Sequence, residues 1–180
     1  MAKKILVHIL ILLMSVLLTY FWINDQILTL YSLQLTAFLL LSLIASHHLH
    51  KPSQFRLVES TVSTICVLLV TSSTGGVRSP LFFLNFILLF ELALLLEPTV
   101  SLALSGGLFL FYLYTHQVGS SPLFLAALLS FPFMTPLAYY FGKIYNKEEN
   151  QKKEIRNLYK EIRELKEELV EDEMKLNRAL

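Results

Sequence analysis

The stretch TSSTGGVRSPLFFLNF, residues 71–86, interrupts a chain of mostly apolar segments with two adjacent glycines, an arginine and a proline. Apolar runs of helical length flank it on both sides. Glycine adopts backbone angles that other residues avoid, and proline lacks a backbone donor, so the two residue types together end helices. The stretch therefore predicts a tight turn between two apolar helices, and it raises the question whether this turn also binds a ligand.

The composition around this stretch is that of a membrane protein. Hydrophobic residues make up 54% of the 180 residues and charged residues 16%, so one water-soluble core cannot hide the apolar surface. The charges are segregated, because residues 1–142 hold five Lys or Arg and four Asp or Glu, whereas residues 143–180 hold ten of each. This division predicts a transmembrane domain over 1–142 and a water-facing tail over 143–180.

The apolar part divides into six segments, each long enough at ~1.5 Å per residue to cross a hydrocarbon core of about 30 Å as a helix. We expect transmembrane helices over residues 5–23, 27–46, 57–74, 80–96, 99–115 and 122–142. The breaks between them carry turn-forming or interfacial residues. The predicted fold is all-α, a polytopic membrane protein with six transmembrane helices followed by a cytoplasmic coiled-coil helix.

The basic residues predict the orientation in the membrane. The first segment is similar to a secretory signal, but no small-residue cleavage site follows, so we expect a retained helix. Lys3, Lys4, Lys51 and Lys143 then all lie on the cytoplasmic side, in agreement with the excess of Lys and Arg in cytoplasmic loops. Both termini are expected to be cytoplasmic, with the lipid bilayer of a bacterial inner membrane as the surroundings. Arg78 alone among the basic residues of the membrane domain falls outside.

Apolar residues in the tail recur at alternating spacings of three and four. These residues, called the seam below, are Ile155, Leu158, Ile162, Leu165, Leu169 and Leu176. Asp172 takes the remaining heptad position, and charged residues fill nearly everything else. Isoleucine at the first and leucine at the fourth heptad position favour a parallel two-stranded coil. We expect a parallel homodimer formed through the seam, with a solvated single helix as the alternative.

The chain carries no motif of a soluble enzyme: it has no phosphate-binding glycine loop, no Cys-x-x-Cys pair and no His-Glu-x-x-His helix. The single cysteine, Cys66, is expected to be a buried and inert thiol. His47, His48 and His50 are interpreted as a basic cap at the membrane boundary, although histidines at this spacing can also share a metal. We predict no catalysis, no covalent cofactor, no metal site and no nucleic-acid partner.

Several polar residues are predicted to lie inside the membrane. Glu91 is either functional, because an ionisable group in the bilayer is costly, or a structural group hydrogen-bonded to a neighbouring helix. Pro132 and Pro136 are expected to bend the sixth helix. Small polar residues predict faces where helices approach closely. These residues are Ser60, Thr64, Thr71, Thr74, Ser101 and Ser105.

The turn itself has a structural explanation that covers only part of its residues. Glycines at 75 and 76 can end the third helix, while Ser79 can cap the fourth and Pro80 suits its first turn. This does not explain Arg78 on the outer side, or the phenylalanines and Asn85 that follow. An arginine or amide donor beside an aromatic wall can hold a planar ring with carbonyl oxygens. The predicted ligand-binding residues are Gly75, Gly76, Arg78, Ser79, Pro80, Phe82, Phe83, Asn85 and Phe86.

The turn and its surroundings resemble the membrane domain of RegB-like, redox-responsive sensor histidine kinases. That family has a Gly-Gly-x-x-Asn-Pro-Phe loop between the third and fourth of six membrane helices, and a cytoplasmic coil that leads to kinase domains. Here the corresponding residues are Gly75, Gly76, Val77, Arg78, Ser79, Pro80 and Leu81, with serine and leucine in place of asparagine and phenylalanine. The resemblance implies a sensor that reads the membrane quinone pool, or another membrane-soluble cue, through this loop.

The resemblance also implies kinase domains beyond the coil, and these are absent from the 180 residues. We therefore expect an input module that does not phosphorylate by itself, either part of a longer kinase or a separate protein whose coil recruits a cytoplasmic kinase or regulator. Two other classes stay open. One is a small transporter or channel with Glu91 and Asn85 along its path, and the other is a membrane anchor that presents the coil to a partner.

Overall fold

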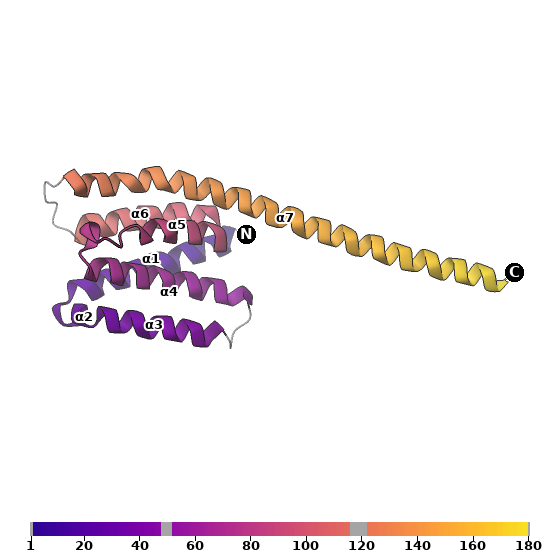
Figure 1. Cartoon of the computed structure of the whole chain (residues 1–180), viewed down its shortest axis with the longest axis horizontal. Coiled ribbons are helices and arrows are strands. Elements are labelled where there is room, and N and C mark those ends of the chain that lie inside the picture. Colours follow the sequence, from indigo (N-terminus) through magenta and orange to yellow (C-terminus); the bar gives the residue numbers. More distant parts are fainter. Residues whose placement is uncertain (1, 48–51, 116–121, 180) are drawn as a thin grey trace. The chain divides into compact units, whose positions relative to one another are not determined.

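The computed structural model describes residues 2–47, 52–115 and 122–179, with side chains described for 5–45, 55–115, 122 and 124–169. Within these ranges every regular element is helical, which confirms the predicted all-α class (Figure 1). The elements are α1 (Ala2–Asn24), α2 (Gln26–Leu30), α3 (Ser32–His47), α4 (Pro52–Ser73), the 3-10 turn η1 (Gly76–Arg78), α5 (Leu84–Leu95), α6 (Pro98–Thr115) and α7 (Pro122–Ala179).

The chain divides into two compact units, Met1–Lys143 and Ile144–Leu180. In the first unit, α4 lies between α1, α3 and α5, while α6 packs against α1 and α5. Among the described residues, four helices (α1, α4, α6 and α7) are long and apolar enough to cross a membrane, judged by length and composition. The other two predicted spans correspond to shorter apolar helices, Ser32–Ala45 and Leu84–Leu95.

The prediction of one continuous helix over residues 27–46 is wrong, because the helix is interrupted at Tyr31, between α2 and α3. At Tyr31, which ends α2, the backbone N–H donates to the Leu28 carbonyl at 3.0 Å. The Asp25 carboxylate defines the other end of this short helix. Its Oδ1 atom accepts hydrogen bonds from the backbone N–H groups of Ile27, at 2.9 Å, and Leu28, at 3.1 Å. These are donors that a new helix leaves unpaired, so Asp25 stabilises the start of α2.

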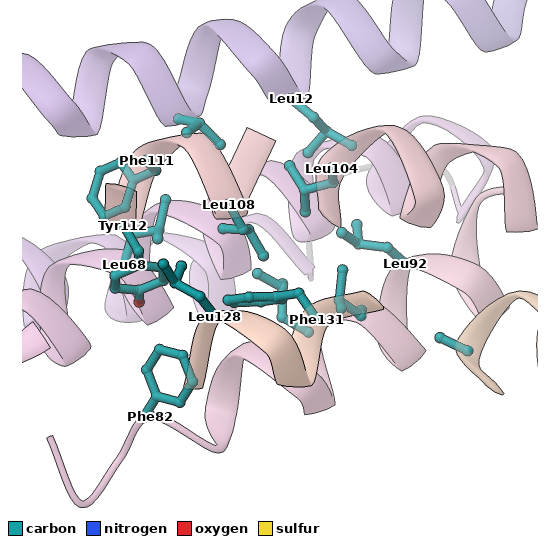
Figure 2. Close-up of a cluster of buried hydrophobic side chains, with 14 of the residues drawn as sticks. Leu12, Leu68, Phe82, Leu92, Leu104, Leu108, Phe111, Tyr112, Leu128 and Phe131 are labelled. Carbon is teal, nitrogen blue, oxygen red and sulfur yellow. The ribbon is translucent and has the colours of Figure 1, made fainter. Parts of the chain in front are cut away.

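Leucines and aromatic rings from α1, α4, α5, α6 and the first part of α7 fill the core of the first unit (Figure 2). Phe131 of α7 is fully buried. Its ring centroid lies 5.8 Å from that of Phe82, 5.6 Å from that of Phe86 and 6.1 Å from that of Tyr112. Aromatic pairs at such distances attract each other beyond the effect of burial alone, so Phe131 joins α7 to the other helices.

The outward faces of the helices in the first unit are apolar as well. Leu30 is 76% exposed, Phe38 67% and Phe133 74%. Exposed apolar side chains on this scale are typical of a surface that contacts lipid or another protein. The pattern fits the membrane surroundings that the composition predicts.

Phe131 and Phe133, two residues apart on α7, provide a matched test of this packing. We expect Phe131→Ala to lower the free energy of unfolding in detergent micelles by about 2 kcal/mol or more, because it leaves a cavity among rings. The loss is smaller than in a water-soluble core, since detergent also solvates the ring in the unfolded chain. Phe133→Ala should cost less than about 0.5 kcal/mol. Equal losses for the two variants would contradict the buried position of Phe131.

Candidate functional site

The loop between α4 and α5 owes its path to Gly75. Helix α4 ends at Ser73, and Gly75 has a φ of 117°, in the left-handed region that other residues rarely adopt. The hydroxyl groups of Thr74 and Ser79 then hydrogen-bond to each other at 2.5 Å across the turn. The loop is thus a compact turn closed by its own side chains, and it needs no ligand to hold its shape.

Ser79 has a different role from the predicted one. Its hydroxyl accepts a hydrogen bond from the Leu81 N–H at 3.0 Å, and its carbonyl accepts one from the Phe82 N–H at 3.1 Å. Tight turns therefore follow Pro80, and α5 begins only at Leu84, with Phe83 as its N-cap. The predicted helix start at residue 80, capped by Ser79, is wrong because these local bonds satisfy the donors that a helix start would leave free.

Asn85 lies at the centre of a buried polar network. Its side chain is completely buried, its Nδ2 donates to the Phe82 carbonyl at 2.9 Å, and its Oδ1 accepts from the Tyr112 hydroxyl at 3.1 Å. The Tyr112 hydroxyl is also 2.8 Å from the Thr71 hydroxyl. The network Thr71–Tyr112–Asn85 joins α4, α6 and α5, and it fixes α5 directly behind the loop.

Tyr112 was not among the residues predicted from the sequence. It is fully buried on α6, and its ring centroid lies 5.2 Å from that of Phe82. The sequence feature that could have indicated it is a tyrosine in an apolar helix, since a buried tyrosine hydroxyl needs a hydrogen-bond partner. The partner, Asn85, lies 27 residues away in the chain, so the spacing of residues gives no indication of the pair.

The predicted ligand-binding residues separate into two groups. Gly76, Ser79, Phe82 and Asn85 are buried within the protein. Both polar groups of the Asn85 side chain are occupied by protein partners, so Asn85 is not an open donor.

On the outside of the loop, the side chain of Arg78 is exposed and Phe83 is 50% exposed. Gly75 and Pro80 are also exposed, and Phe86 is partly buried against Phe82 at a centroid distance of 5.6 Å. Among the exposed residues of the loop, Arg78 and Phe83 are the two that carry a charged or an aromatic side chain. Asn85, Phe82 and Phe86 support the loop from within.

Glu91, the predicted intramembrane carboxylate, lies on α5 and is partly buried. Its carboxylate has a hydrogen-bond partner in the Ser63 side chain of α4, and the Glu59 carboxylate of α4 is close enough to interact with it electrostatically. This pairing is the kind of interhelical bond that a structural role requires. The small polar residues Ser60, Thr64 and Thr71 of α4 are fully buried, as predicted, whereas Thr74 is exposed.

Metal-binding groups are not assembled in the part of the chain that the structure describes. Among the described residues, no group of three His, Cys, Asp or Glu side chains could hold a metal ion. His48 and His50 lie outside the described residues, and the same is true of the His47 side chain. Cys66 is free and buried, as predicted, with its Sγ atom 4.0 Å from the Thr36 carbonyl oxygen.

Apolar pockets open on the sides of the first unit. One of about 480 Å³ lies between α6 and α7, beside Gly106, Pro132 and Pro136, and helix α7 continues through both prolines. The hydroxyl groups of Ser105 and Thr135 in its lining hydrogen-bond to each other. A second pocket of about 480 Å³ lies between α1 and α6. The residues of the 75–83 loop line neither pocket.

Comparison of the chain with protein-family models, with curated proteins and with solved structures gave no match.

Tyr112 and Tyr114, both on α6, allow the buried network to be tested. We expect Tyr112→Phe to lower the free energy of unfolding by about 1–2 kcal/mol, because it leaves the buried Oδ1 of Asn85 without its partner. Tyr114 is 70% exposed, so Tyr114→Phe should have almost no effect. Unfolding in micelles, followed by circular dichroism, measures both. Combining Tyr112→Phe with Thr71→Val should cost less than the sum of the two single changes, and additive losses would argue against one shared network.

Proposed function

We propose that this chain is a membrane-embedded input module for signal transduction. In this proposal six helices cross a bacterial cytoplasmic membrane, both termini are cytoplasmic, and the tail pairs with that of a second copy. The 75–83 loop on the outer side detects a membrane-soluble cue, and α7 carries the response to a cytoplasmic kinase or regulator. The chain performs no catalysis of its own.

The observation that carries the proposal is the unpartnered seam on α7. Its five residues with described side chains are 51–62% exposed; they are Ile155, Leu158, Ile162, Leu165 and Leu169. The same helix begins at Pro122, within the first unit, and continues through the tail. A seam of this period buries its apolar side chains when a second helix pairs with it. Helix α7 therefore connects a membrane bundle to a dimerisation surface without interruption.

One pair of charges beside the seam fits a parallel partner. Up to Leu169 the heptad positions on one flank are glutamate, at Glu154, Glu161 and Glu168, while Tyr159 and Lys166 occupy the other flank; beyond Leu169 the two flanks carry Lys175 and Glu173. In a parallel coil one flank meets the opposite flank of the second copy, which places Glu161 beside Lys166 of that copy. An antiparallel coil would lose this pair, because each flank would then meet the same flank of the second copy. The ion pairs along the helix, Lys153–Glu149 at 2.8 Å and Arg163–Glu167 at 3.3 Å, leave Glu161 and Lys166 available.

The loop supports the sensing part of the proposal. The exposed Arg78 guanidinium and Phe83 ring could contact a planar ring that carries carbonyl oxygens, which is the chemistry of a quinone. Behind them, the Thr71–Tyr112–Asn85 network holds α5 at a defined position. A cue can shift the module only by binding one arrangement of the helices more tightly than another.

Charge reversal in the tail tests the parallel dimer. We expect Lys166→Glu to weaken dimerisation of the full-length protein in liposomes roughly tenfold, because two attractive contacts per dimer become repulsive. The double variant Glu161→Lys with Lys166→Glu should restore the wild-type affinity, since the two charges exchange places. Energy transfer between labelled copies, measured against lipid dilution, gives the affinity. Weakening by Lys166→Glu that the double variant fails to reverse would argue against this register.

Substitution of Arg78 tests the sensing role. In a chimera of this chain with a histidine-kinase output, in vesicles with defined quinone and quinol content, we expect Arg78→Ala to reduce the response to the quinone redox state roughly tenfold. Phe83→Ala should act in the same direction. Leu102→Ala serves as the control, because Leu102 is 57% exposed on α6. An unchanged response in both loop variants would refute the loop as the sensing element.

A further inference from the structure

Helix α5 connects the loop to the end of the first unit. Its first turn carries Asn85, which bonds the Phe82 carbonyl and Tyr112. Its last turn carries Ala93, which is completely buried. The 12 residues of α5 span about 18 Å at the helical rise. Because a packed helix of this length moves as one body, a displacement at the loop end also displaces Ala93.

Ala93 meets α7 at an unusually close contact. A Cβ atom added at Gly142 would lie 2.6 Å from the Ala93 carbonyl oxygen and 2.9 Å from its Cβ atom. Both distances are too short for non-bonded atoms, and a backbone carbonyl cannot rotate away as the end of a side chain can. Helix α7 can therefore lie this close to α5 only because residue 142 is glycine.

The residues beside this contact fix which side of α7 faces α5. The Phe141 ring packs against the Phe90 ring of α5, with centroids 6.0 Å apart. Ala138, one turn before Gly142, is completely buried. Rotation of α7 about its axis would bring a larger side chain against Ala93. The rotational setting of α7 at Gly142 thus depends on where α5 lies.

We infer that the contact between Gly142 and Ala93 is where α5 sets the rotation of the output helix. This inference rests on the proposed function. Gly142 lies in the first unit, and the seam begins at Ile155 of the same helix. A rotation imposed at Gly142 changes which face of α7 is presented to the second copy. Gly142 and Ala93 are positioning residues, because they act on the seam and do not contact the cue.

Two glycines make a matched pair for the test. Alanine favours helix over glycine by about twofold to fivefold per site, so Gly→Ala should be harmless where space is open. An added Cβ at Gly106 meets nothing within 4 Å. Gly106→Ala should therefore leave α7 in place, whereas Gly142→Ala should force it away from α5.

The experiment measures disulfide cross-linking between two full-length copies in liposomes, with Cys66→Ser as the background. A single cysteine is placed either at Ile155, in the seam, or at Arg156, beside it. We expect the ratio of cross-linking at 155 to that at 156 to fall roughly fivefold or more in Gly142→Ala. In Gly106→Ala the ratio should stay at the wild-type value. Equal ratios in the two glycine variants would overturn the inference while leaving the dimer intact.

A second measurement detects the contact between Ala93 and Gly142 independently of dimerisation. In the liposome-embedded full chain, solid-state NMR should give a carbon–carbon correlation between the Ala93 carbonyl and the Gly142 Cα, and the correlation should persist in Gly106→Ala. Its absence from wild type would overturn the inference whatever the state of the tail. Lack of cross-linking in all variants, with the correlation present, would instead refute the proposed dimer.

If Gly142→Ala fails to insert, Ala93→Gly loosens the same contact from the α5 side without adding an atom. Ala93→Gly should bring the ratio of cross-linking at 155 to that at 156 closer to one. An unchanged ratio would overturn the inference.

Discussion

The hydroxyl group of Tyr112 joins the three helices that surround the 75–83 loop from within. It bridges Asn85 of α5 and Thr71 of α4 from a fully buried position on α6. In an apolar environment these polar groups cannot hydrogen-bond to water, so each of them needs the others as hydrogen-bond partners. This constraint places the start of α5 behind the 75–83 loop. It also determines where the last turn of α5, with Ala93, meets α7.

The sequence predicted much of the fold because hydropathy alone separates apolar helices from polar turns. The helical class, the long helices α1, α4 and α6 and the turn at Gly75 follow from that pattern. The break at Tyr31 was not predicted, because it is a local change in backbone bonding, in which the Tyr31 N–H donates to the Leu28 carbonyl at 3.0 Å. The late start of α5 was missed for the same kind of reason, since Ser79 forms local bonds that compete with a helix.

The site was less predictable than the fold. Asn85 was expected to contact a ligand, yet it is completely buried, and its Nδ2 and Oδ1 atoms bond to Phe82 and Tyr112. Contacts between residues far apart in the chain leave no periodic pattern in the sequence. Neither the role of Tyr112 nor the contact of Gly142 with Ala93 could therefore be predicted from the spacing of residues. Arg78 and Phe83 are exposed, and their recognition role stays a prediction.

The most direct test of the central claim, that the tail forms a parallel two-stranded coil, is a distance between copies. Spin labels at Arg156 or at Arg163 occupy the same heptad position, one heptad apart on the outer face of the helix. Pulsed electron paramagnetic resonance on the full-length protein in liposomes should give the same distance between copies at both positions. Clearly different distances, or no dipolar coupling between copies at either position, would contradict the parallel coil.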